Sequence, residues 1–305
     1  MTDHVAVGLD GSAESTAAAQ WAAGEALLRG VPLEIVHVEE WLEHPPHTAS
    51  TGEITRRWAD ALLEETAGAL LALHPGLEIT THRRGGLPPE ALARAADTSS
   101  MLVLGSRGLG GMAGFVMGSV ASGTVARARR PVVLVRASAD APADGAVITA
   151  DGAVVAADSA VIAADGAVVA GVDARRPCGE LLGFAFDAAS RRGHRLRVVH
   201  AWTPPPVLSY APDLDPALLQ EMSRAVAVAL DDMVAPWCDK YPAVEVDRST
   251  PVGQAAVHVL EAAHDSALVV IGRRIRSSAF GAHIGSVAHA VVHHCTVPVA
   301  VVAHD

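Results

Sequence analysis

Short apolar runs alternate along the chain with longer segments in which alanine and other apolar residues recur at helical spacing. In the first half, the apolar runs that predict strands are Val5–Leu9, Leu33–Val38, Leu77–Thr81, Met101–Leu104 and Val132–Val135. The segments between them predict helices at Ser12–Arg29, Ile54–Leu73 and Pro89–Asp97, and a fourth that begins at Ser119. Strands that alternate with helices indicate a parallel sheet covered on both faces.

The second half repeats this pattern. Its predicted strands are Val168–Val172, Leu196–Ala201, Val244–Asp247, Ala267–Ile271 and Val299–Val302, and its predicted helices are Pro177–Arg192, Pro216–Cys238, Gly253–His264 and one from Ser286. Asp10 and Asp173 are 163 residues apart, as are His37 and His200, and Gly105 and Gly272 are 167 apart. A repeat of this length indicates a duplicated domain, so we expect two domains, residues 1–138 and 167–305.

Residues 139–166 between the halves carry a seven-residue repeat, which continues into the next strand as "ADGAVIT ADGAVVA ADSAVIA ADGAVVA". One interpretation is an inert linker made by copying a strand. The other is a small β-meander, because Asp-Gly pairs between strand-like residues suit two-residue hairpins. The sequence assigns this linker no ligand.

Right-handed crossovers favour a doubly wound sheet, in which ligands bind beyond the carboxyl ends of the strands where the strand order reverses. For the order 3-2-1-4-5, that crevice lies between the first and fourth strands. Asp10 ends the first strand, and the stretch "GSRGLGGMAGFVMGS", Gly105 to Ser119, follows the fourth. We therefore expect these two distant segments to meet at one site.

The glycine-rich stretch has the features of a phosphate cradle. Glycine lets a ligand approach the backbone, and successive N–H groups form a concavity that binds anions. Ser119 is expected to cap the following helix, whose positive N-terminus suits phosphate, and Arg107 can add a charged donor. The stretch is not a Walker A loop, and "GLGGMA" matches a dinucleotide fingerprint only weakly because it follows the wrong strand.

The spacing Gly105-x2-Gly108-x9-Gly118-Ser119 resembles that of the universal stress protein family, tandem-domain type, over nearly all of both halves. The resemblance implies an ATP-binding α/β fold of the HUP group with strand order 3-2-1-4-5. It also implies a nucleotide-dependent role in a stress response, with ATP, with or without Mg²⁺, as the cofactor. By position, Gly8 and Asp10 would flank adenine and ribose, and Val38 would offer backbone contacts to the adenine edge.

The resemblance assigns the remaining site residues of the first half to two groups. The residues expected to line the ribose and phosphates are Leu104, Gly105, Arg107 and Gly108. The residues expected to hold the phosphate tail are Gly118, Ser119 and Val120. In the second half the counterparts are Asp173, Gly272, Gly285 and Ser286, but Ile275 replaces the middle glycine and Arg273, Arg274 and Arg276 flank it. A β-branched residue tolerates positive φ poorly and can fill the phosphate space, whereas the arginines could instead bind phosphate by charge.

The composition of the chain argues against several classes of function. The net charge is −11, and aromatic residues make up 4% of the chain, which argues against a nucleic-acid-binding surface. Three widely spaced cysteines, with no signal peptide and no membrane-length apolar run, favour a cytoplasmic protein without a membrane partner. No metal motif is evident, since "HAVVH" on the last helix lacks the glutamate of HExxH.

No catalytic triad or nucleophile motif appears, so we expect a binding protein and no catalytic residues. A slow ATPase or nucleotidyl-transfer enzyme is the alternative, and a structural protein with a vestigial site is a third hypothesis. The last strands of the halves, "PVVLV" and "PVAVV", are short apolar edges. The resemblance implies that they pair the halves as an intrachain pseudo-dimer, and homodimer formation stays open.

The sequence predicts that the second half binds nucleotide more weakly than the first, differently, or not at all. The reason is the loss of the middle glycine at Ile275 and the change of "DGS" to Asp173-Ala174-Arg175. Titration of ATP into the separately expressed halves measures the difference. Equal affinities would contradict the prediction.

Overall fold

The computed structural model describes residues 3–40, 49–107, 117–137, 166–205, 216–275 and 284–304. The chain divides into two compact units, and each contains one five-stranded sheet in which every strand pairs with its neighbours in parallel. Of the predicted linker 139–166, only Gly166 belongs to the described residues, so the choice between inert linker and β-meander lies outside them.

The first unit contains β1 (Val5–Gly8), α1 (Ala13–Arg29), β2 (Leu33–Glu39), α2 (Ala49–Leu73), β3 (Ile79–Gly85), α3 (Pro88–Thr98), β4 (Met101–Gly105), α4 (Ser119–Arg127) and β5 (Val132–Val135). Its strand order is β3-β2-β1-β4-β5, which confirms the predicted doubly wound sheet. In the register, Val7 lies beside Ile35 of β2 and Val103 of β4. The order therefore reverses between β1 and β4.

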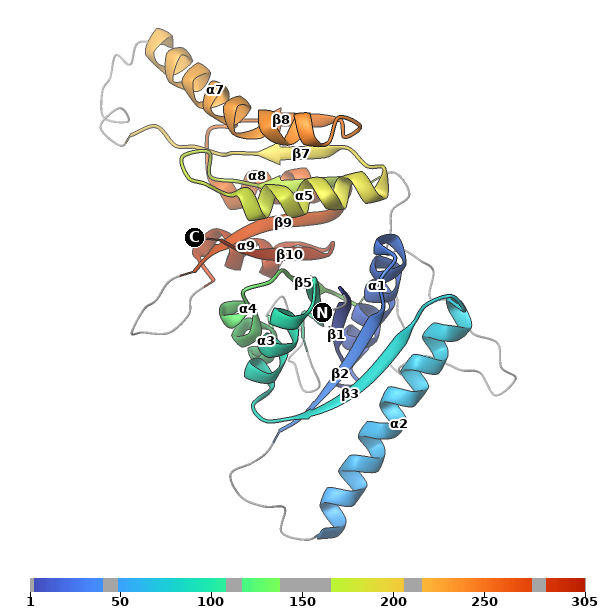
Figure 1. The fold of residues 1–305 in the computed structure, drawn as a ribbon. Coiled ribbons are helices and arrows are strands. Elements are labelled where there is room, and N and C mark those ends of the chain that lie inside the picture. The colour runs from blue at the N-terminus through green and yellow to red at the C-terminus, as the bar shows by residue number, and fades with distance from the viewer. Residues whose placement is uncertain are drawn as a thin grey trace. The chain divides into compact units, whose positions relative to one another are not determined.

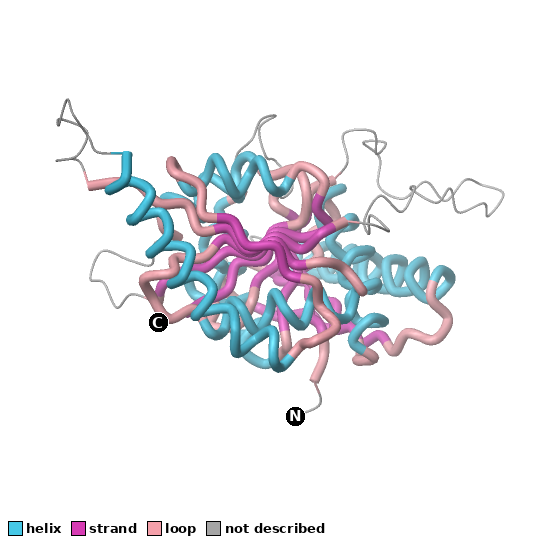
Figure 2. Tube along the Cα trace, turned by 90° about the horizontal axis from the view of Figure 1, so that it is seen from above, coloured by secondary structure: helices cyan, strands magenta, loops and turns pink. Residues whose placement is uncertain are grey.

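Helices cover both faces of this sheet. Helix α1 contacts β1, β4 and β5 and also touches α2, whereas α3 packs on β2 and β4 and against α4. Figure 1 shows α1 and α2 on one side of the strands and α3 and α4 on the other. Seen from above in Figure 2, the strands run between helices. The fully buried strand residues, such as Val5, Val103 and Val133, form the core between these layers.

The second unit contains β6 (Ala167–Gly171), α5 (Gly179–Arg192), β7 (Leu196–Val199), α7 (Pro216–Lys240), β8 (Val246–Ser249), α8 (Ala255–Ala263), β9 (Ser266–Arg274), α9 (Ser286–His294) and β10 (Val299–His304). Its strands follow the order β8-β7-β6-β9-β10, the same as in the first unit. Helices α5 and α7 contact each other, as do α8 and α9. The predicted duplication of the fold is therefore confirmed.

Capping explains where α1 begins and ends. The Ser12 hydroxyl accepts a hydrogen bond from the Ser15 N–H at 3.1 Å, and Gly30 ends the helix in the left-handed region at φ 65°. Between these caps, α1 buries its alanine-rich face, including Ala18, Ala22 and Ala26.

Some boundaries differ from those the apolar pattern predicts. Helix α2 begins at Ala49 instead of Ile54, and β3 spans Ile79–Gly85 instead of Leu77–Thr81. Leu77 is buried, but its N–H bonds the His74 carbonyl in a turn, while most residues of the edge strand β3 are exposed. An apolar run therefore marks the buried turn before β3 and not the strand itself.

Gly105 holds β4 against the start of α1. A Cβ at this position would lie 2.8 Å from the carbonyl carbon of Glu14 and 2.9 Å from the Ser15 nitrogen, both backbone atoms that cannot rotate away. We expect Gly105→Ala to lower the free energy of unfolding by about 1–3 kcal/mol, because the added methyl overpacks this contact. Urea unfolding followed by circular dichroism measures the change.

Gly76→Ala is the matched control, since a Cβ there meets nothing within 4 Å. Equal stability of the two variants would contradict the close packing of β4 on α1.

Candidate functional site

A pocket of about 440 Å³ lies at the carboxyl ends of β1 and β4 in the first unit. This volume falls within the range of small-molecule sites, about 300–1,000 Å³. The pocket's lining includes every predicted site residue of the first half that the structure describes: Gly8, Asp10, Val38, Leu104, Gly105, Arg107, Gly118, Ser119 and Val120. Gly108 lies outside the described residues. The two distant segments that were predicted to meet, after β1 and after β4, thus border one pocket.

The N-terminus of α4 supplies one end of the pocket. Gly118 is the N-cap residue, with φ −64° and ψ 153°, and Ser119 is the first helical residue. The prediction that Ser119 caps the helix is therefore wrong, because the extended residue that precedes the helix is the glycine. Among the described residues, no side chain caps this helix, and its first three residues, Ser119, Val120 and Ala121, all line the pocket. The N–H groups of a first helical turn have no intrahelical partner, so this end favours an anion.

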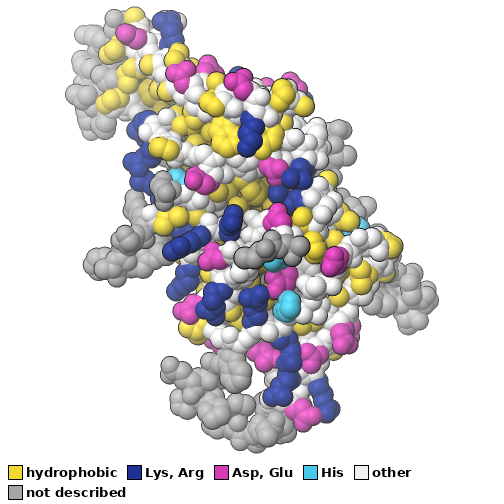
Figure 3. Space-filling view, viewed as in Figure 1, with side chains coloured by type: hydrophobic (Ala, Val, Ile, Leu, Met, Phe, Trp, Pro, Cys, Tyr) yellow, Lys and Arg dark blue, Asp and Glu magenta, His cyan; other side chains and the backbone are white. Residues whose placement is uncertain are grey.

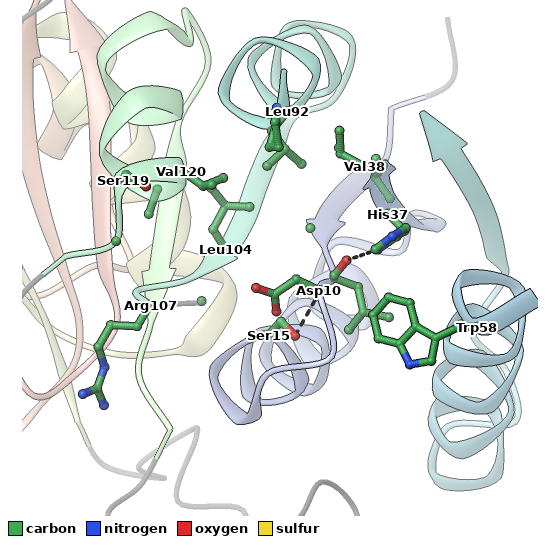
Figure 4. Close-up of a pocket in the computed structure, with 17 residues that line it drawn as sticks. Asp10, Ser15, His37, Val38, Trp58, Leu92, Leu104, Arg107, Ser119 and Val120 are labelled. Carbon is green, nitrogen blue, oxygen red and sulfur yellow. Dashed lines mark hydrogen bonds between the residues drawn. The ribbon is translucent and has the colours of Figure 1, made fainter. Parts of the chain in front are cut away.

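Asp10 lies on the other side of the pocket, after β1. Its Oδ1 accepts hydrogen bonds from the Ser12 N–H at 3.0 Å and from the Ser12 hydroxyl at 2.6 Å. Its own N–H donates to the Ser15 hydroxyl at 3.3 Å. Asp10 therefore shapes the turn into α1 and also borders the pocket, so the turn role and the binding role are compatible (Figure 4).

Arg107 borders the pocket, but its guanidinium makes an ion pair with Glu14. Its Nη2 lies 2.9 Å from the Glu14 Oε1, and both side chains are mostly buried. Figure 4 shows the side chain extending away from Leu104 and Ser119. An anion in the pocket would have to compete with Glu14 for this guanidinium.

The pocket is also lined by eight residues that the sequence did not assign to the site: Leu9, Ser15, Val36, His37, Trp58, Pro88, Leu92 and Ala121. The His37 Nδ1 lies 2.8 Å from the Leu9 carbonyl oxygen, which makes that nitrogen the donor and joins the ends of β1 and β2. One signal for His37 was present in the sequence, because the same histidine recurs 163 residues later as His200. Trp58 carried no comparable signal.

The second unit places its counterparts at the same points of the fold. Asp173 follows β6, Gly272 lies within β9, and Gly285 precedes Ser286, the first residue of α9. The Asp173 carboxylate is engaged by Arg175 at 3.2 Å and by Arg176 at 3.3 Å. Partial burial raises the pKa of Asp173, but hydrogen bonds and charge from Arg175 outweigh this and hold it below its ordinary value.

The predicted strain at Ile275 does not arise, because no described non-glycine residue has positive φ. Instead, the Ile275 N–H bonds the His304 carbonyl at 2.8 Å, so extended pairing continues past β9. Gly272 lies beneath the His304 ring, since a Cβ there would fall 2.5 Å from its Nε2. The counterpart of the segment that begins the predicted phosphate loop of the first unit is thus sheet-like in the second.

No group of three or more His, Cys, Asp and Glu side chains that could hold a metal ion occurs in the described part of the chain. His289 and His293 stack with ring centroids 4.1 Å apart, which confirms that they share a helix face. No described helix combines the length and apolar character that a membrane span requires.

These features define a duplicated doubly wound α/β protein with a crevice pocket in its first unit. The universal stress protein family model matches residues 1–136 and 166–303. Universal stress protein Rv2005c of Mycobacterium tuberculosis is 34% identical over 309 residues, which cover 97% of this chain and 96% of that protein. The chain therefore belongs to the universal stress protein family.

One solved structure shares this fold over nearly the whole chain, and another is similar over less than half of it. A universal stress protein from Archaeoglobus fulgidus DSM 4304 superposes with a TM-score of 0.65 at 18% identity and covers 99% of this chain and 98% of that one. The universal stress protein from Archaeoglobus fulgidus in complex with dAMP is 27% identical, covers 43% of this chain and 96% of that one, and has a TM-score of 0.33.

The reactivity of the Cys178 thiol shows whether a cysteine contributes chemistry beside Asp173. A cysteine at a helix N-terminus ordinarily has a lowered pKa. Here burial, with added repulsion from Asp173 and Glu180, raises the pKa of Cys178 to about 11. We expect iodoacetamide at pH 8 to modify the partly exposed Cys238 first and to leave Cys178 and the buried Cys295 largely unmodified until denaturant is added. Peptide mass spectrometry measures the order, and equally fast labelling of Cys178 and Cys238 would contradict it.

Proposed function

We propose that the first unit binds an adenine nucleotide, ATP with or without Mg²⁺, and that the chain acts as a nucleotide-dependent regulatory module in a stress response. The observation that carries the proposal is the N-terminus of α4, which no side chain of the described residues caps, at the border of a pocket that Asp10 also borders. The two ends of the pocket differ in chemistry. Bare N–H groups suit phosphates at one end, and a carboxylate suits the hydroxyl or amine groups of a nucleoside at the other.

The remaining expectations from the sequence stay part of the proposal. They are the contact roles of the fourteen site residues, the domain limits 1–138 and 167–305, the intrachain pseudo-dimer and the cytoplasmic location. The chain is proposed as a binding protein without catalytic residues. Release of labelled phosphate from ATP under multiple-turnover conditions would instead favour the slow ATPase.

Ser119→Pro tests the phosphate end. Proline is well tolerated at the first helical position and lacks the N–H, and the extended Gly118 suits a residue before proline. Because hydrogen bonds to charged groups contribute about 1.5–3 kcal/mol, we expect ATP affinity to fall about tenfold or more. Ser119→Ala removes the hydroxyl but keeps the N–H, so its loss should be smaller. Isothermal titration calorimetry of the full chain measures both.

Adenosine is the control ligand, since it lacks phosphates and should bind the wild-type chain and Ser119→Pro with similar affinity. An unchanged ATP affinity in Ser119→Pro would contradict phosphate binding at α4, and the absence of ATP binding to the wild-type chain would overturn the proposed function.

A further inference from the structure

Trp58 is an unusual surface residue. Tryptophan is highly buried on average, yet 46% of Trp58 is exposed, within a stretch of α2, residues 53–58, in which every residue is exposed. This half of α2 extends beyond the strands of its own unit (Figure 1). Trp58 nevertheless lines the pocket at the carboxyl ends of β1 and β4.

One ring contact and one nearby glycine define the place of the Trp58 ring at the pocket. The ring meets His37 edge to face, with centroids 5.5 Å apart and an interplanar angle of 75°. His37 is buried and fixed in turn by its hydrogen bond to the Leu9 carbonyl. On the other side, Gly11 has φ 85° and so lies in the left-handed region. A Cβ on Gly11 would come within 3.2 Å of the Trp58 Cζ2, so the glycine leaves room for the indole. The aromatic surface is therefore positioned before any ligand binds.

The place of Trp58 within the pocket is specific. His37, which its ring contacts, and Gly11, which leaves room for it, are the chain neighbours of Val38 and Asp10. Figure 4 shows Trp58 beside His37 and Asp10, while Ser119 and Val120 lie on the far side of the pocket. Trp58 therefore borders the end opposite the helix N-terminus.

We propose that Trp58 is the wall that packs on the base of the bound nucleotide and makes the site prefer a purine base over a pyrimidine. This proposal rests on the proposed function, because it assumes that phosphates occupy the α4 end. Aromatic side chains bind nucleobases by stacking, and a purine offers the larger ring surface. The exposed face of the indole would then be covered by the ligand.

The matching helix of the second unit has no aromatic residue at the position of Trp58. Helices α2 and α7 both contain 25 residues, and the tenth residue is Trp58 in α2 and Ala225 in α7. A base bound in the second unit would have no aromatic partner at that helix position. Changes at Trp58 in the full chain therefore report on the first unit.

The test is calorimetry of the full chain with ATP, CTP and inorganic tripolyphosphate. Stacking on an aromatic side chain is worth about tenfold to a hundredfold in affinity per base, so Trp58→Ala should weaken ATP by that factor. It should weaken CTP less, so the ATP-to-CTP affinity ratio falls. Tripolyphosphate affinity should not change, and Trp58→Phe should retain most of the affinity for ATP.

Ile54→Ala is the matched control, because Ile54 is 69% exposed one turn earlier on α2 and does not line the pocket. Unchanged ATP affinity in Trp58→Ala, or an equal loss for all three ligands, would overturn the role of Trp58 while the proposed function stands. Absence of ATP binding to the wild-type chain would overturn both. Thermal unfolding of each variant separates lost binding from lost folding.

Discussion

The parallel pairing of β1 with β4 is the constraint on which the pocket depends. These strands are separated in sequence by three helices and two strands, yet Val7 lies beside Val103 in the register. The pairing brings the end of β1, and Asp10 beyond it, next to Gly105. The absence of a side chain at Gly105 then lets the start of α1 pack directly on β4. Because α1 begins with the turn that Asp10 forms, this backbone contact sets the position of Asp10 relative to the end of β4.

The sequence was sufficient for the buried framework and for the meeting of distant segments. Buried strands such as β1 and β4 appear as apolar runs, and the crevice follows from the strand order and not from any local motif. The edge strand β3 was placed less well, because its residues face solvent and its boundary is set by pairing with β2. The predicted N-cap of α4 was wrong by one residue, because the pattern of residues does not show whether the glycine or the serine is the last extended residue before the helix.

Trp58 could not be found from the sequence for a different physical reason. The predicted helix at Ile54–Leu73 contained it, but which side of an exposed helix half faces a pocket depends on the helix's position on the sheet. Periodicity fixes the buried stripe only where the helix is covered by the sheet, and residues 53–58 are all exposed. The contact with His37 is a property of the fold, and only the recurrence of that histidine was visible in the sequence.

The two repeated histidines belong to the framework that both units share, whereas the residues around them differ. The His200 Nδ1 lies 3.1 Å from the Val172 carbonyl oxygen, as the His37 Nδ1 lies 2.8 Å from that of Leu9, so both units join the ends of their first two strands in the same way. Around this shared link the surroundings differ: Asp173 is held by arginines, and β9 continues where β4 stops.

In the first unit the pocket is bordered by helices from both faces of the sheet, α1 and α2 on one and α3 and α4 on the other. The pocket therefore depends on the packing of both helix layers on the sheet. A ligand that bound only this folded arrangement would stabilise it against unfolding by mass action.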